Sequence, residues 1–335
     1  MNRELLRYMN KIEKKEFAMP YHIELHPTTA CNQDCVWCIM REQRMVNSGT
    51  LSKEQLYRIA LQVADNEEIK VVFLSGGGDP LVNEHLFEKY EYCGITCNNY
   101  FELLTRAGAG VAISTNGEYL GRIIECGGAR YISSLRVSID AGTEEQYANL
   151  HRSKRNARLE DIIRLIERFY EISQKKVEIS YLLHEGNIGG YTLLAEKFHV
   201  PEAVSYIKVK HLIGDMDRFP EGRENLSVNG ISIVFEKGKE IPEGYYALQT
   251  SLLINSKGDV YPCCHMVDHG DQYLLGNVFE KDLHEIFSER FSMVRDLYCE
   301  RCAGLEVNQI FYRFHLVKQK LGDGWERIEE EEKMR

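Results

Sequence analysis

The stretch YHIELHPTTACNQDCVWCIM (residues 21–40) joins a strand pattern directly to a cysteine motif. Its start alternates polar and apolar residues in period 2, which is typical of a strand, and Cys31, Cys35 and Cys38 follow in a C-x-x-x-C-x-x-C spacing. Thiolates are soft ligands that favour iron–sulfur clusters, zinc or copper(I). A cubane cluster takes one ligand per iron, so three cysteines would leave one iron open. A structural zinc site would instead need a distant fourth His or Cys.

The strand pattern recurs up to about residue 215, with helical patterns between the strands. Short β-branched or apolar runs lie at 70–75, 110–115, 134–140, 177–183 and 205–213. Two capping boxes, Ser52 with Gln55 and Thr143 with Gln146, indicate helix starts, and residues 159–172 place apolar side chains on one helix face. Six strands with intervening helices predict an α/β barrel or a doubly wound parallel sheet. In both architectures ligands bind at the carboxyl ends of the strands.

Composition and charge limit the class of protein. The 335 residues carry a net charge of −10, which argues against nucleic acid or an anionic membrane as a partner. We find no secretory signal and no apolar run near the ~20 residues of a membrane span, and we expect a cytoplasmic protein. In a reducing compartment the ten cysteines favour ligands, catalysts or buried side chains over disulfides. We expect Cys93, Cys97 and Cys126 to be buried apolar side chains.

The cysteine motif after the first strand resembles that of the radical S-adenosylmethionine (SAM) superfamily, over residues 20–215. The resemblance implies a partial (β/α)6 TIM-like barrel and a [4Fe–4S] cluster bound by Cys31, Cys35 and Cys38. It implies that SAM chelates the open iron through its amino and carboxylate groups. An electron, delivered by a flavodoxin or a ferredoxin, would then cleave SAM to methionine and a 5′-deoxyadenosyl radical.

Three further segments resemble SAM-binding motifs of the family, each after a predicted strand: SGGGDP (75–80), STNG (114–117) and SIDA (138–141). The resemblance implies that the first holds the SAM amino group, although Asp79 stands where Glu is commoner. It assigns Ser138 and Asp140 to the ribose, Trp37 to the adenine side and Arg152 to the SAM carboxylate. The cofactor-binding residues predicted in this way are Trp37, Gly76, Gly77, Gly78, Asp79, Ser114, Asn116, Ser138, Asp140 and Arg152.

A second group of cysteines lies in the C-terminal part. SLLINSKGDVYPCC (251–264) predicts a hairpin that ends in two cysteines, and CERC adds a C-x-x-C pair. Together they resemble part of the SPASM and twitch domains, which implies one auxiliary [4Fe–4S] cluster, although C-x-x-C spacing suits zinc equally well. The expected ligands are Cys263, Cys299 and Cys302, with Cys264 or His265 as a fourth.

The candidate catalytic residues are a thiol and three groups that could accept a proton. Because successive side chains on a strand point to opposite faces, we expect Cys263 and Cys264 not to bind one cluster together. Cys264 is then a candidate free thiol that donates a hydrogen atom to a substrate radical. Alternation on the first strand places Glu24 and His26 on one face. The catalytic candidates are Cys264, Glu24, His26 and Lys210.

These patterns divide the chain into five segments. They are an N-terminal extension (1–19), the core barrel (20–215), a linker (216–250), a small α+β SPASM- or twitch-like domain (251–322) and an acidic tail (323–335).

The resemblance implies a radical SAM oxidoreductase or epimerase. We expect a small polar substrate of the kind found in antibiotic biosynthesis, such as a sugar, an aminocyclitol or an aminoglycoside-like compound. The alternative is a peptide or protein maturase; only about 20 residues precede the first strand, so we expect no N-terminal recognition domain. A cluster- or zinc-binding protein without SAM chemistry is a third hypothesis, and the intact cysteine loop and SGGGDP argue against it.

Overall fold

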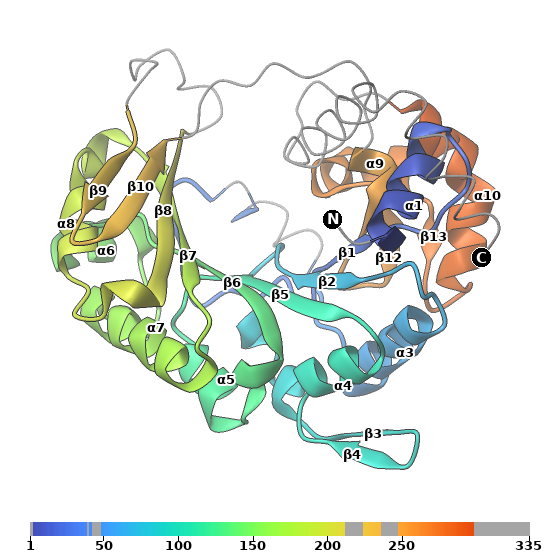
Figure 1. Cartoon of the computed structure of the whole chain (residues 1–335), viewed down its shortest axis with the longest axis horizontal. Coiled ribbons are helices and arrows are strands. Elements are labelled where there is room, and N and C mark those ends of the chain that lie inside the picture. The colour runs from blue at the N-terminus through green and yellow to red at the C-terminus, as the bar shows by residue number, and fades with distance from the viewer. Residues whose placement is uncertain (1–2, 39, 42–47, 212–223, 236–246, 298–335) are drawn as a thin grey trace.

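The computed structural model describes residues 3–38, 40–41, 48–211, 224–235 and 247–297. Its centre is one curved sheet of eleven strands in the order β13-β12-β11-β1-β2-β5-β6-β7-β8-β10-β9. Figure 1 shows the sheet as an open arc with helices along its convex face. The strands are β1 (His22–Leu25), β2 (Val71–Leu74), β5 (Gly110–Thr115), β6 (Ile132–Ser138), β7 (Val177–Leu183), β8 (Val204–His211), β9 (Leu226–Val228), β10 (Ile231–Phe235), β11 (Ser251–Ile254), β12 (Asp259–Tyr261) and β13 (Gly276–Asn277).

The six predicted strands are the parallel centre of this sheet. Neighbours from β1 to β8 pair in parallel register, for example Ile23 with Val72 and Ile179 with Ile207. The prediction of an α/β fold with a large parallel sheet is therefore confirmed. The helices are α1 (Arg3–Glu13), α3 (Lys53–Ala64), α4 (Tyr100–Arg106), α5 (Leu120–Glu125), α6 (Glu144–His151), α7 (Leu159–Ser173), α8 (Gly190–Glu196), α9 (Ala247–Thr250) and α10 (Leu283–Asp296).

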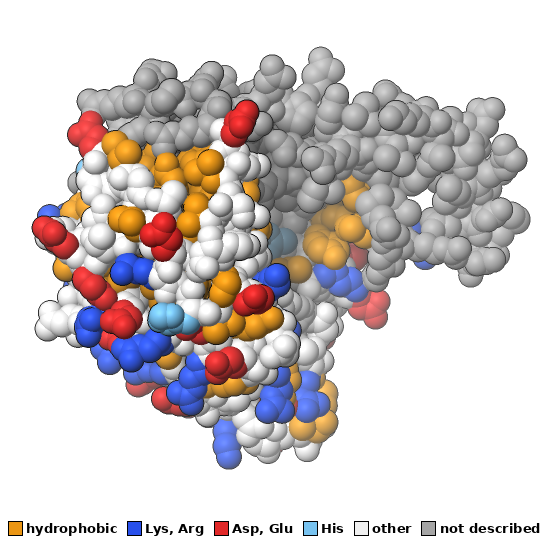
Figure 2. Space-filling view, turned by 60° about the vertical axis from the view of Figure 1, so that its left-hand side comes forward, with side chains coloured by type: hydrophobic (Ala, Val, Ile, Leu, Met, Phe, Trp, Pro, Cys, Tyr) orange, Lys and Arg blue, Asp and Glu red, His pale blue; other side chains and the backbone are white. Residues whose placement is uncertain are grey.

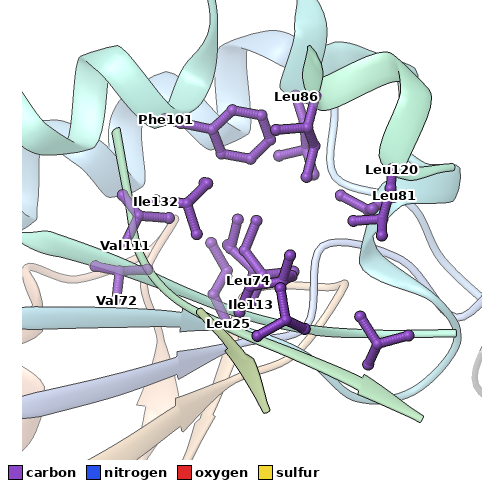
Figure 3. Close-up of a cluster of buried hydrophobic side chains, with 14 of the residues drawn as sticks. Leu25, Val72, Leu74, Leu81, Leu86, Phe101, Val111, Ile113, Leu120 and Ile132 are labelled. Carbon is purple, nitrogen blue, oxygen red and sulfur yellow. The ribbon is translucent and has the colours of Figure 1, made fainter. Parts of the chain in front are cut away.

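Burial along the central strands alternates with period 2. Residues on the helix side are fully buried, and those on the concave side are half-buried, as in the pattern of β7 from Val177 to Leu183. Figure 3 shows strand residues such as Leu74 and Ile113 packed against Phe101 of α4. Burying each such side chain contributes about 1.5–3 kcal/mol. The core therefore lies between sheet and helices, and the concave face is left for function.

Both edges of the parallel centre are extended by later segments of the chain. Strand β11 pairs in parallel with β1, and β10 pairs in parallel with β8. The predicted hairpin at 251–264 is present as β11 and β12, and the predicted linker at 216–250 contains β9 and β10. The segments on both sides of the predicted boundaries at 215 and 251 thus contribute strands to one sheet, while 298–322 and the tail lie outside the described residues.

The two predicted helix caps differ. Ser52 and Gln55 form the complete capping box of α3. At α6, Thr143 Oγ1 accepts a hydrogen bond from the Gln146 N–H at 3.1 Å. The Gln146 side chain accepts from the Gly142 N–H at 2.9 Å instead of the Thr143 N–H, so only half of the predicted box forms.

One prediction about a cysteine is wrong. Cys93 is exposed and has φ of +50° in the turn of the two-stranded hairpin β3–β4 (Tyr90–Tyr92 and Ile95–Cys97). Cys97 is buried as expected, and Cys126 is half-buried. The two positions differ because Cys93 lies at the tip of the hairpin and Cys97 at its base. The sequence pattern does not distinguish these positions, so the prediction treated them alike.

The surface carries charges of both signs. Figure 2 brings the α8–β9 side forward and shows acidic and basic side chains interspersed, with hydrophobic side chains gathered on its upper part. The large hydrophobic side chains that are exposed on α8 and β9 include Leu193 and Leu226. Within the described residues, none of the helices has the length and apolarity needed to cross a bilayer.

Candidate functional site

The cysteine loop that follows β1 is anchored by the end of helix α6. The Asp34 N–H donates to the His151 carbonyl at 3.2 Å, and the Val36 N–H donates to the Leu150 carbonyl at 3.0 Å. The last carbonyls of a helix have no partner inside the helix, and here loop amides satisfy two of them. Arg152 ends the helix with a left-handed backbone and an exposed side chain. The path of the loop is therefore set by main-chain hydrogen bonds.

The glycine loop after β2 lies directly against the cysteine loop. The Gly78 N–H donates to the Thr28 carbonyl at 3.1 Å, and the Asp79 N–H donates to the Ala30 carbonyl at 2.9 Å. A Cβ on Gly78 would lie 1.9 Å from the Ala30 oxygen, so only glycine permits this approach. The predicted glycine-rich motif is thus packed beside the cysteine motif, as SAM binding at both would require.

The three thiols of the loop gather at the carboxyl end of the sheet. Burial, and then the charges of Asp140, Cys31 and Cys38, raise the pKa of the Cys35 thiol. In the described residues no three His, Cys, Asp or Glu side chains converge closely enough to hold a single metal ion. Three soft donors on one loop fit an iron–sulfur cluster that takes one thiolate at each of three irons.

The Asp79 carboxylate is buried and contacts residues at the end of β5. One carboxylate oxygen accepts from Thr115 Oγ1 at 2.8 Å and from the Asn116 N–H at 2.7 Å, and the other accepts from the Leu81 N–H. Burial raises the pKa of Asp79 to about 6, against these hydrogen bonds. Asp79 therefore ties the glycine loop to the end of β5, and its role at the SAM amino group stays a prediction.

Asn116 belongs to the same junction. Its side-chain amide donates to Asn32 Oδ1 at 2.8 Å and approaches Cys31 Sγ at 3.9 Å. The neighbouring predicted residues Ser114 and Ser138 are half-buried on the concave face. Their roles toward SAM also stay predictions.

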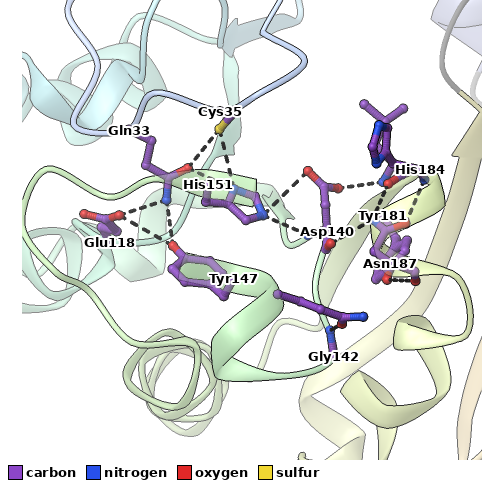
Figure 4. A network of polar contacts seen from close by, with 12 residues as sticks. Gln33, Cys35, Glu118, Asp140, Gly142, Tyr147, His151, Tyr181, His184 and Asn187 are labelled. Carbon is purple, nitrogen blue, oxygen red and sulfur yellow. Dashed lines mark hydrogen bonds and ion pairs between the residues drawn. The ribbon is translucent and has the colours of Figure 1, made fainter. Parts of the chain in front are cut away.

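Trp37 lies in a polar network that sequence reasoning did not identify. Its ring centroid is 5.5 Å from that of His184 and 6.1 Å from that of His151. Figure 4 shows His151 between the Asp140 carboxylate, Gln33 and Cys35. Burial raises the pKa of Asp140 to about 7, although hydrogen bonds from the Leu182 N–H and Trp37 oppose it. His151 was visible only as the residue before Arg152 in NLHR.

A second polar group lies at the ends of β1 and β2. Glu24 Oε1 accepts hydrogen bonds from His26 Nε2 at 3.0 Å and from the Ser75 hydroxyl. Burial alone would raise the pKa of Glu24, but the hydrogen bond and charge of His26, with Ser75, bring it to about 2. Gly76 lies against the same ring, since a Cβ there would be 1.7 Å from His26 Nε2. Two predicted catalytic residues, Glu24 and His26, are thus in contact.

Cys263 and Cys264 adjoin this group. A hydrogen bond between the two thiols lowers the pKa of Cys263 to about 7 and raises that of Cys264. The charge of Glu24 acts on both thiols. Strand alternation therefore does not apply to this pair, because β12 ends at Tyr261 and Cys264 begins a 3-10 helix. The expectation that the two thiols do not bind one cluster together stays a prediction. The predicted partners Cys299 and Cys302 lie outside the described residues.

Lys210, the last catalytic candidate, lies away from this group. It is on β8, and its charge acts on Asp140. In the strand order, β8 is separated from β1 by four strands. The structure therefore places the candidates in two sets, Glu24, His26 and Cys264 in one and Lys210 near Asp140 in the other.

Two family models match the chain. The radical SAM superfamily model matches residues 25–188, and that of an iron–sulfur cluster-binding domain, SPASM, matches residues 246–303. No curated protein shows a significant match.

Solved structures show the same fold at low identity. SuiB of Streptococcus suis bound to the precursor peptide SuiA has a TM-score of 0.61 and 16% identity, covering 89% of this chain and 73% of that one. His-tagged anSMEcpe with bound AdoMet has a TM-score of 0.56 and 15% identity, covering 85% and 86%.

Proposed function

Because this chain belongs to the radical SAM superfamily and carries a SPASM iron–sulfur domain, we propose that it abstracts hydrogen from a small polar substrate. Family membership implies a [4Fe–4S] cluster that binds SAM, and the SPASM domain implies further iron–sulfur binding. The donor set of Cys31, Cys35 and Cys38 fits the first cluster. When bound, this cluster and SAM supply the hydrogen-abstracting radical.

One observation carries the proposal on the substrate. A pocket beside the cysteine loop is lined by His26 and by Gly77 of the glycine loop. Its other wall comes from the C-terminal part, with Lys257, Asp259 and Asp271. Carboxylates accept from hydroxyl and ammonium groups, and lysine donates to oxygen. A pocket that joins the predicted SAM side to charges of both signs suits a sugar, an aminocyclitol or an aminoglycoside-like compound.

Glu24 and His26 give this pocket a proton acceptor. The ionised Glu24 accepts from His26 Nε2 and so orients the ring. Removing a hydrogen atom from a carbinol carbon makes the hydroxyl proton easier to remove, and we propose that His26, which lines the pocket, accepts it. General base catalysis of this type contributes on the order of 10²–10⁴-fold. Dehydrogenation also removes one further electron, for which we propose the iron–sulfur cluster of the SPASM domain as the acceptor, and it is the outcome that this pair favours.

Epimerisation is the second candidate, and the Cys263–Cys264 contact favours it. In this candidate reaction the thiol near Glu24 donates its hydrogen atom to the substrate carbon and becomes a thiyl radical, which an electron from the flavodoxin or ferredoxin donor reduces. Solvent deuterium separates the two outcomes, because thiol protons exchange with water. Turnover in D2O would place deuterium on the substrate carbon in epimerisation and not in dehydrogenation, and a Cys264→Ala protein would lose that label.

The substrate class is tested with reconstituted protein under anaerobic conditions. Panels of sugars, aminocyclitols and aminoglycosides, and a separate panel of peptides, are added with SAM and dithionite, and 5′-deoxyadenosine is quantified. We expect a member of the first panels to stimulate 5′-deoxyadenosine formation at least tenfold. When that compound carries deuterium at the attacked carbon, we expect the deuterium to appear in 5′-deoxyadenosine. Stimulation by peptides alone would favour the maturase alternative and overturn the proposal.

The setting of this chemistry is also a proposal. Thiolate-bound clusters and ten cysteines suit a reducing compartment, and we propose that the protein is located in the cytoplasm. A flavodoxin or a ferredoxin is the electron donor that we propose.

A further inference from the structure

His151 is buried beside the cysteine loop and has no role in the proposed reaction. Its side chain is 1% exposed and stacks on Tyr147, with ring centroids 4.6 Å apart at an interplanar angle of 25°. Its Nδ1 atom lies 3.6 Å from Cys35 Sγ, within the range of a hydrogen bond to sulfur. The direction of that contact depends on which ring nitrogen carries the proton.

The backbone of Asp140 fixes the tautomer of His151. The Asp140 N–H points at His151 Nε2 over 3.0 Å. An amide N–H can only donate, so Nε2 must be the acceptor and carries no proton. The neutral ring therefore holds its proton on Nδ1, the nitrogen that faces Cys35.

Gln33 supports the same assignment from the other side. Its side-chain nitrogen donates to Glu118 Oε1 at 2.8 Å and to Tyr147 Oη at 2.6 Å. Glu118, when ionised, can only accept, which fixes the amide so that Oε1 points to His151. That oxygen lies 3.1 Å from Nδ1 and needs a donor. Two independent partners thus place the hydrogen on Nδ1 (Figure 4).

Metal binding changes what Cys35 can do. As a thiol, it donates to Gln33 Oε1 at 3.4 Å. A cysteine that binds iron is deprotonated, and a thiolate can only accept. The proton on Nδ1 then lies between two acceptors, Gln33 Oε1 and Cys35 Sγ.

We infer that His151 donates an N–H···S hydrogen bond to the Cys35 thiolate of the SAM-binding cluster and thereby raises the reduction potential of that cluster. Hydrogen bonds to cluster sulfurs are among the factors that set such potentials, because a donor stabilises the more negative, reduced state. Cys31 has comparable donors in the Gln33 N–H at 3.5 Å and the Asn116 amide. In this role His151 acts through Cys35, as a positioning and tuning residue.

Three variants of the full chain test the inference. His151→Phe keeps an aromatic ring on Tyr147 and removes both nitrogens, and His151→Asn restores an N–H donor near the position of Nδ1. Tyr147→Phe is the matched control, since it removes a partner of Gln33 and leaves the donor to Cys35. Each protein is reconstituted anaerobically, its iron and sulfide are counted, and the reduced cluster is followed by EPR. The signal that changes on addition of SAM identifies the relevant cluster.

We expect the midpoint potential of this signal to fall in His151→Phe by about 59 mV, a tenfold change in a one-electron equilibrium. It should recover in large part in His151→Asn and stay at the wild-type value in Tyr147→Phe. An unchanged potential in a fully loaded His151→Phe protein would overturn the inference. So would an equal shift in Tyr147→Phe, because the effect would then be structural.

The wild-type protein provides a measurement that does not depend on variants. With 15N-labelled histidine, pulsed EPR of the reduced, SAM-sensitive cluster should detect weak coupling to a histidine nitrogen, together with an exchangeable deuteron in D2O. Absence of the nitrogen coupling would contradict the hydrogen bond, even if His151→Phe fails to take up iron. Neither readout depends on the substrate proposal, so the two can fail separately.

Discussion

Two carboxylate–histidine pairs lie at the carboxyl end of the sheet, and they behave in opposite ways. In the first, His26 Nε2 meets Glu24 at 3.0 Å, and the pKa of Glu24 falls to about 2, although burial raises it. In the second, His151 Nε2 lies 3.6 Å from an Asp140 carboxylate oxygen. Burial raises the pKa of Asp140 to about 7.

The difference comes from one backbone N–H. The Asp140 amide occupies His151 Nε2, so this ring has no proton to offer the carboxylate. His26 Nε2 instead faces Glu24 and can donate to it. In the first pair the Glu24 carboxylate is therefore held ionised, next to a ring that lines the proposed substrate pocket. The other holds a neutral ring with its N–H turned to the cysteine loop.

The largest expected effect comes from breaking the first pair with Gly76→Ala. A Cβ would lie 1.7 Å from His26 Nε2, at a backbone φ of +70°. We expect the free energy of unfolding to fall by about 5 kcal/mol, at the upper end for single substitutions. Urea unfolding of the apo protein, followed by circular dichroism, measures it.

The matched control is Gly94→Ala, at φ of +75° with nothing within 4 Å of the added Cβ. It should cost only about 1–2 kcal/mol, the price of the left-handed conformation. Equal losses in the two variants would show that the contact with His26 is not tight.

Asp140→Asn tests the second pair through pH. The folded pKa is raised from 3.8 to about 7, so between these values the folded state keeps a proton that the unfolded state has released. Wild-type stability from this group therefore falls as the pH rises from about 4 to about 7. The variant lacks that slope, and its stability relative to wild type should increase by up to about 4 kcal/mol over this range. Urea unfolding across the pH range measures the difference, and a constant difference would contradict the buried-acid assignment.

Glu24→Gln should give the opposite slope and a smaller effect. The folded pKa of Glu24 is lowered from 4.5 to about 2, so its contribution is present above about pH 4.5 and is lost as the pH falls toward 2. We expect the variant to be about 3 kcal/mol less stable at pH 6, with the deficit shrinking in acid. Parallel curves for variant and wild type in acid unfolding would argue that His26 does not hold Glu24 ionised.

The first pair could be predicted from sequence and the second could not. Alternation on β1 placed Glu24 and His26 on one face, and their contact at 3.0 Å confirms it. The role of His151 depends on the direction of the Asp140 amide and on Gln33, 118 positions away along the chain. No local period encodes a tautomer that such distant groups decide.

Some features of the fold could also be predicted from the sequence, and others could not. Short apolar and alternating runs identified the six strands from β1 to β8, because a strand with one face in the core leaves a local signature. They did not show that β11 would pair with β1, since the choice of a partner edge depends on which edge the rest of the fold leaves free. The contact of Cys263 with Cys264 was missed because alternation holds only inside a strand, and β12 ends at Tyr261.

The pairing of β1 with β11 means that β1 is synthesised long before one of its two partner strands. His22 is opposite Ser251, so one edge of β1 has no partner until roughly 230 further residues have been made. At about 5–20 residues per second, this interval is on the order of 10–50 s. An open parallel edge is a template for wrong pairing. The strand that leads into the cysteine loop is thus the one that the nascent chain exposes longest.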